Sequence, residues 1–136
     1  MEWDIAFEKE KSIILNKVKE NIRYLIQETT LTPTQFSVLL HFAPNYVCNI
    51  LKENKDIDKT PSLNFVLRIY FYLKIDFLIF FREKDEFCNY LNINLNKIKK
   101  RIEYLKKEDY YQTQLIIYKA YNKEKKEIGR YKKIKK

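Results

Sequence analysis

Apolar residues recur at helical spacing from about residue 12 to residue 26. Five of them fall three or four positions apart and therefore share one face of a helix: Ile14, Val18, Ile22, Leu25 and Ile26. Ser12 is a residue type that caps helix starts, so the pattern predicts an amphipathic helix beginning near Ser12. Before it, Trp3, Ile5 and Phe7 alternate with charged and small residues. This alternation fits a strand-like arm or an extra helical turn that covers the core, and we favour the turn.

The stretch from Leu31 to Leu51 predicts two short helices joined by a tight turn of about three residues. Thr32 suits an N-cap, and Pro33 suits the first helical position, where its missing N–H costs nothing. An apolar stripe follows at Phe36, Leu39 and Leu40. We expect the second helix to begin at Pro44. Its inward face would hold Val47, Ile50 and Leu51, and its outward, polar face would hold Asn45, Asn49 and Lys52.

Two further helices are predicted after a polar stretch, KENKDIDKT, which is typical of a surface loop. Thr60-Pro61-Ser62 is helix-start chemistry, and an apolar stripe follows it at Leu63, Val66, Leu67, Tyr70 and Leu73. Asp76 is expected to cap a short fifth helix through FLIFF, residues 77–81. This apolar run needs cover from the chain itself or from a second subunit.

The last third of the chain has a different period. Its apolar residues step by four and three, as in the seam of a coiled coil or helical hairpin: Leu91, Leu95, Ile98, Ile102 and Leu105. After Leu105 the frame breaks, and a second register runs through Tyr111, Leu115 and Tyr118. Gly129 is expected to end the last helix. The seam either pairs with a second subunit or folds back on its own domain.

Composition supports an all-α fold. The 136 residues include one Gly and three Pro, which leaves few helix breakers, and 46% of them are hydrophobic, enough for a real core. No apolar run is long enough to span a membrane, and the acidic start lacks the layout of a signal peptide. We therefore expect a cytoplasmic protein.

The charge is uneven along the chain. Residues 1–96 hold 12 Lys and Arg against 13 Asp and Glu, a net of −1, whereas residues 97–136 hold 15 against 5, a net of +10. Cys48, Cys88 and the single His41 are too few and too scattered for a metal site or a disulfide framework. Neither a catalytic constellation nor a phosphate-binding Gly-rich loop is present, so we expect no enzyme activity and no cofactor.

The order and spacing of four segments resemble the Cro and lambda-repressor-like helix-turn-helix family, also called the Xre family. The segments are NIRYLIQETT, LTPTQFSVLL, APNYVCNIL and TPSLNFVLRIYFYLKIDFLIFF, and the resemblance spans residues of about 12 to 82. It implies a five-helix domain, residues 1–86, that binds double-stranded DNA. A helical extension with a basic tail, residues 87–136, would follow and dimerise. The second helix of such a pair lies in the major groove.

The resemblance also implies which residues contact DNA. Base-edge contacts fall on Pro44, Asn45 and Asn49, while Tyr46 and Lys52 are expected at the backbone, and Thr34 on the preceding helix is a further DNA-binding position. Asparagine can pair with adenine through two hydrogen bonds. For Tyr46, a hydrogen bond to a phosphate oxygen and packing of the ring on the turn are equally good interpretations. Relatives often carry Gly where His41 stands, and histidine adopts a left-handed conformation less readily than glycine; His41 is expected to support the turn rather than to perform chemistry.

These observations leave two hypotheses. The first is a sequence-specific transcriptional regulator, more often a repressor than an activator, that acts as a homodimer in which FLIFF packs on the partner's seam. The KENKDIDKT loop would then lie near DNA. The second is a non-enzymatic interaction module whose basic tail binds nucleic acid without sequence preference, because the near-neutral charge of residues 1–96 supplies little attraction to phosphate. An effector ligand or a protein partner is left open.

Overall fold

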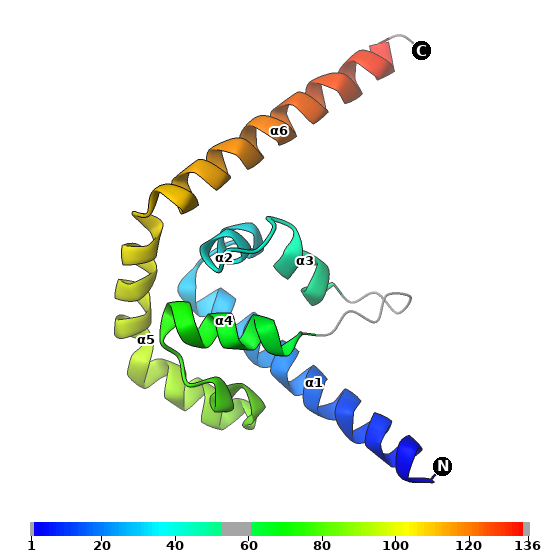
Figure 1. The fold of residues 1–136 in the computed structure, drawn as a ribbon, viewed down its shortest axis with the longest axis vertical. Coiled ribbons are helices and arrows are strands. Elements are labelled where there is room, and N and C mark those ends of the chain that lie inside the picture. Colours follow the sequence, from blue (N-terminus) through cyan, green and yellow to red (C-terminus); the bar gives the residue numbers. More distant parts are fainter. Residues whose placement is uncertain (1, 53–60, 135–136) are drawn as a thin grey trace.

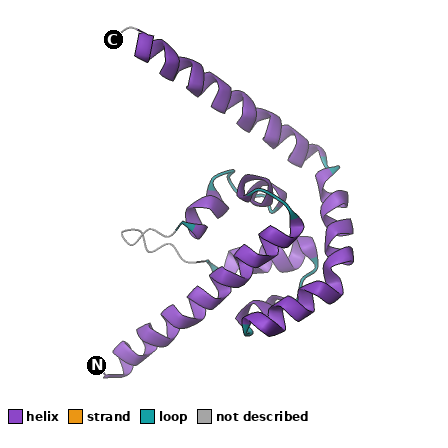
Figure 2. Ribbon diagram, turned by 180° about the vertical axis from the view of Figure 1, so that it is seen from behind, coloured by secondary structure: helices purple, strands orange, loops and turns teal. Residues whose placement is uncertain are grey.

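The computed structural model describes residues 2–52 and 61–134, with side chains up to residue 125, and this part of the chain is helical without a strand (Figures 1 and 2). Its elements are α1 (Glu2–Thr29), α2 (Pro33–Leu39), α3 (Tyr46–Leu51), α4 (Leu63–Leu73), the short 3₁₀ helix η1 (Phe77–Phe81), α5 (Lys84–Lys106) and α6 (Asp109–Ile134). The predicted all-α fold class is confirmed. Among the described residues, no helix combines the length and apolar character needed to cross a membrane.

Helix α1 is longer than predicted. It begins at Glu2 and runs through Ser12, so the expected cap at Ser12 is wrong. Every side chain from residue 2 to residue 14 is exposed, and Trp3 keeps 87% of its surface accessible. The expected cover for the core is therefore also wrong, because α1 reaches the domain only near Val18 and its first turns project away from it (Figure 1).

Local capping chemistry sets the starts of three shorter elements. The Thr32 hydroxyl accepts a hydrogen bond from the Gln35 N–H, and the Gln35 side chain accepts one from the Thr32 N–H, which forms a complete capping box with Pro33 as the first residue of α2. Ser62 caps α4 in the same manner through the Phe65 N–H, and the Asp76 carboxylate accepts from the Leu78 N–H at the start of η1. These predicted caps are confirmed.

One hydrophobic core joins α1 to α5. Its largest fully buried side chains are Phe36, Phe65, Phe80 and Phe87. Four of the five seam residues of α5 belong to this core, since Leu91, Ile98, Ile102 and Leu105 are all at most 3% exposed. The fifth, Leu95, is half-buried. The expectation that this seam packs on FLIFF of a second subunit is therefore wrong. Helix α5 folds back on α1, α4 and η1 of its own chain, and the predicted division at residues 86/87 falls inside this shared core.

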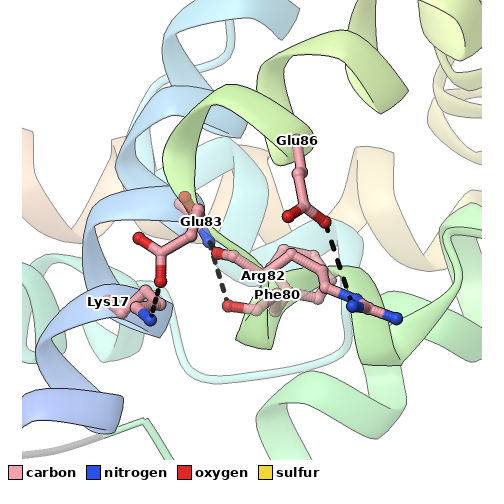
Figure 3. Close-up of polar contacts among 6 residues, drawn as sticks. Lys17, Phe80, Arg82, Glu83 and Glu86 are labelled. Atoms are coloured by element: carbon pink, nitrogen blue, oxygen red, sulfur yellow. Dashed lines mark hydrogen bonds and ion pairs between the residues drawn. The ribbon is translucent and has the colours of Figure 1, made fainter.

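Polar contacts fix the junction between η1 and α5 against α1. Asn21, buried on α1, donates from Nδ2 to the carbonyl oxygens of Phe80 and Arg82, both at 3.0 Å. One turn earlier on α1, Lys17 donates from Nζ to Glu83 Oε1 at 2.5 Å (Figure 3). The two Asn21 bonds satisfy carbonyl groups at the end of η1, and the Lys17 bond holds Glu83, the N-cap residue of α5, against α1.

The predicted break after Leu105 is confirmed, because α5 ends at Lys106 and α6 begins at Asp109. Gln112 of α6 donates from Nε2 to the Lys106 carbonyl oxygen at 2.6 Å across this break. The predicted end at Gly129 is wrong, since the helix continues to Ile134. A glycine inside a helix costs only about 1 kcal/mol, too little to end a long helix on its own. Beyond its base, α6 extends away from the domain (Figure 1).

Candidate nucleic-acid interface

The connection between α2 and α3 spans residues 40–45 and contains a left-handed residue. His41 has φ 65°, and its N–H donates to the Val38 carbonyl oxygen at 3.0 Å. Histidine tolerates this region better than most residues that carry a Cβ. Pro44 and Asn45 still belong to the turn, so α3 begins at Tyr46, two residues later than expected. The turn is therefore longer than the predicted three residues.

Ser37 joins α2 directly to α3. Its side chain is fully buried, its hydroxyl donates to the Pro33 carbonyl oxygen at 2.8 Å, and its oxygen accepts from the Val47 N–H at 3.0 Å. The Val47 N–H lies in the first turn of α3, where a helix has no partner of its own for such a donor. Ser37 thus satisfies a buried donor and fixes the relative position of the two helices.

An aromatic cluster supports the turn from the side of α4. The Phe42 ring stacks on Tyr46 with centroids 4.0 Å apart, and both rings contact Phe65. The Tyr46 hydroxyl lies 3.2 Å from the Ser62 hydroxyl. The sequence left two interpretations for Tyr46, a contact to the DNA backbone and packing on the turn. The ring packs on the turn, and the hydroxyl has a hydrogen-bond partner within the chain.

Arg68 of α4 serves the end of α2. Its guanidinium donates to the carbonyl oxygens of Leu40 and His41, at 3.2 and 2.7 Å, and lies 4.2 Å from the centre of the Phe42 ring. The bonds satisfy carbonyl groups that a helix end leaves without partners, and the ring contact adds a cation–π attraction. Arg68 therefore holds the turn as well as the helix end.

Two cations of α1 hold the C-terminal end of α3. Arg23 donates to the Leu51 carbonyl oxygen at 2.5 Å, and Lys19 donates to the Lys52 carbonyl oxygen at 3.3 Å. Positive groups at a helix C-terminus also interact favourably with the helix dipole. Helix α3 has only six residues, so these contacts and the buried side chains Val47 and Ile50 supply the order that its length cannot.

The face of α3 opposite these buried residues is polar and accessible. Asn45 and Lys52 are exposed, Asn49 is half-buried, and Cys48 is exposed between them. The four positions are related by helical spacing (i, i+3, i+4, i+7) and so form one surface, as predicted for the three polar residues. Cys48 was considered in the sequence only as a metal or disulfide residue, although the same spacing places it on this face.

The remaining predicted contact residues lie outside α3. Pro44 is half-buried in the turn before α3, and Thr34 is half-buried in the first turn of α2. The predicted surface loop KENKDIDKT lies outside the described residues except for Lys52. Asn45, Cys48, Asn49 and Lys52 therefore make up the described outer surface of α3, which we call the α3 surface.

His41 also ties the turn to the base of α6. Its imidazole lies between two tyrosine rings and is nearly parallel to both, with centroids 4.7 Å from Tyr72 of α4 and 4.1 Å from Tyr110 of α6. Its Nε2 is 3.9 Å from a carboxylate oxygen of Glu108. This stack sets α6 beside the turn, and sequence reasoning missed it because its three rings come from separate parts of the chain.

A group of cations lies outside the α3 surface, whose own cation is Lys52. A groove of about 410 Å³ between the end of α4 and α5 has four cationic residues in its lining, Lys74, Lys97, Lys100 and Arg101. Further lysines follow on α6 at positions 119, 123 and 125.

Comparison with models of known protein families, with curated proteins and with solved structures found no match for this chain.

Proposed function

We propose that this chain is a sequence-specific DNA-binding transcriptional regulator of the cytoplasm that represses by occupying a promoter. The observation that carries the proposal is the α3 surface: a polar face on a short helix that is held at both ends. Ser37 and the Phe42 cluster hold its start, and Arg23 and Lys19 hold its end. A helix held in this way can enter a major groove without a further ordering cost.

Asn45 and Asn49 are the proposed base-reading residues. An asparagine amide can donate to N7 and accept from N6 of the same adenine, and one such pair discriminates by about 1–3 kcal/mol. The two residues are four positions apart and so lie on the same face of α3. Lys52, at the end of α3, is proposed to supply a backbone contact, and Pro44 and Thr34 are proposed to add apolar and hydroxyl contacts.

The phosphate attraction is proposed to come from α6 rather than from α3. In the described part of α6, Lys119, Lys123 and Lys125 follow the base that His41 sets beside the turn. Binding should therefore weaken steeply with salt, and the slope should fall when these lysines are removed. Sequence preference should survive their removal, because the α3 surface is unchanged.

The test is a competition gel shift on selected DNA with the full chain. Asn49→Ala should lose about 1–3 kcal/mol at one base position and leave non-specific binding nearly unchanged. Asn96→Ala is the matched control, since Asn96 is an exposed asparagine on α5. An equal loss on all sequences would assign Asn49 to the DNA backbone, and no preference for any selected sequence would overturn the proposal.

The near-neutral charge of residues 1–96 favours one alternative, a non-enzymatic interaction module that binds nucleic acid only through its basic tail. The same assay separates the two. If the full chain shows no sequence preference and deletion of residues 123–136 abolishes binding, the alternative holds. If the truncated chain binds more weakly but keeps its sequence preference, the proposal of a sequence-specific regulator holds.

A further inference from the structure

The first half of α1 carries an apolar face that nothing in the described chain covers. Trp3, Phe7 and Ile14 are 87%, 64% and 42% exposed. They continue, at steps of four and seven residues, the face on which Val18 and Leu25 are buried in the core. The core-facing stripe of α1 therefore runs past the edge of its own domain for more than three helical turns.

Helix α6 repeats this arrangement at the other end of the chain. At its base, Tyr110 stacks on His41. Ile117 and Tyr121, seven and eleven residues later, lie on the same face and are 55% and 61% exposed. A face that packs on the domain at its root thus continues without cover.

The two arms carry opposite charge. Residues 2–14 of α1 contain four acidic side chains, Glu2, Asp4, Glu8 and Glu10, against Lys9 and Lys11. Residues 115–125 of α6 contain Lys119, Lys123 and Lys125 against Glu124. Pairing of either arm with its own kind would place like charges together, whereas an α1 arm beside an α6 arm brings opposite charges together.

We propose that residues 2–14 of α1 bind the exposed face of α6 in a second copy of this chain. The two arms leave the domain at different places and diverge (Figure 1), so one chain does not pair them with each other. In a two-fold dimer each copy gives its α1 arm and receives its partner's, which forms two equivalent contacts and closes the assembly. This dimer is independent of whether α3 reads DNA.

The first experiment measures the mass of the full chain in solution at micromolar concentration. The wild type should show twice its chain mass of 16.7 kDa, and Trp3→Ser combined with Phe7→Ser should show the single mass. Ile93→Ser is the control, because Ile93 is 82% exposed on α5 and belongs to neither arm. A wild type that stays monomeric, or a control that also dissociates, would overturn the proposal.

A charge exchange identifies the pairing. Glu8→Lys with Glu10→Lys in one chain, and Lys119→Glu with Lys123→Glu in another, should each give monomers, because each contact then joins like charges. An equimolar mixture should regain the dimer mass, because both contacts join opposite charges again. If the second variant alone still dimerises, or the mixture stays monomeric, α1 does not pair with α6.

Discussion

The helix pair α2–α3 and the helix α6 differ in length and in how many of their ends are fixed by neighbouring residues. Helices α2 and α3 have seven and six residues, too few for stability in isolation, and are fixed by neighbours at both ends. Helix α6 has 26 residues and is held mainly at its base by Tyr111, which is 5% exposed, and by the Tyr110 stack. The short helices are therefore fixed by tertiary contacts and not by their length.

Helix α1 contains both a segment anchored in the core and a segment that projects away from it. Its second half carries core residues such as Ile22, which is fully buried, together with Arg23 and Lys19, which hold α3. Its first half contributes nothing to the core. The boundary near residue 15 separates a part that builds the α3 surface from a part that is available to another molecule.

The largest expected difference in unfolding free energy is between Phe65→Ala in the core and a truncation on the exposed face of α6. Phe65 is fully buried against Phe36, Phe42 and Tyr46, and truncation of such a ring costs about 3–5 kcal/mol of unfolding free energy. Tyr121→Ala, on the exposed face of α6, should cost at most about 0.5 kcal/mol. Urea unfolding at a concentration where the chain is monomeric measures both. Similar losses would mean that the arm is as tightly packed as the core.

The sequence predicted most reliably what is set locally. Thr32, Ser62 and Asp76 cap the helices that they were expected to cap, because an N-cap needs only the three residues that follow it. The outward positions of Asn45, Asn49 and Lys52 followed from helical spacing alone.

What depends on distant contacts was missed or wrong. The seam of α5 has the same pattern whether it meets a partner or its own domain, and only the packing against α1, α4 and η1 decides between them. Arg68 and Tyr110 support the turn from separate parts of the chain, which no local pattern indicates. Ser12 and Gly129 are ordinary helix-end residues that lie inside long helices, because neither residue type breaks a helix when its neighbours favour it.

A pair of variants at His41 tests how the turn and the arm depend on each other. Both His41→Ala and His41→Gly remove the stack with Tyr72 and Tyr110, but only alanine keeps a Cβ in the left-handed conformation. A left-handed residue with a Cβ costs about 1–2 kcal/mol, so His41→Gly should be more stable than His41→Ala by about 1 kcal/mol. Thermal unfolding of the two variants gives this difference. Equal stability would show that the turn relaxes once the stack is lost.

The smallest expected effect concerns the base of α6 at alkaline pH. Burial raises the pKa of Tyr111 above the ordinary tyrosine value, and the Glu103 carboxylate raises it further. The folded chain therefore prefers the neutral phenol. The contribution of the neutral Tyr111 phenol to the free energy of unfolding is fully present below the pKa of the unfolded chain, about 10. It is lost as the pH rises through the higher pKa of the folded chain.

Tyr111→Phe removes this ionisation while keeping the ring that packs between α5 and α6. Above a pH of about 10, the wild type should lose stability faster than the variant, and below that pH the two curves should run parallel. The pKa of Tyr24 is also raised, first by its hydrogen bond with Cys88, but Tyr24 is present in both chains and so cancels in the difference. Urea midpoints measured across the alkaline range give the comparison. Curves that stay parallel above pH 10 would mean that Tyr111 ionises without opposition from the fold, and that the base of α6 is held by the His41 stack instead.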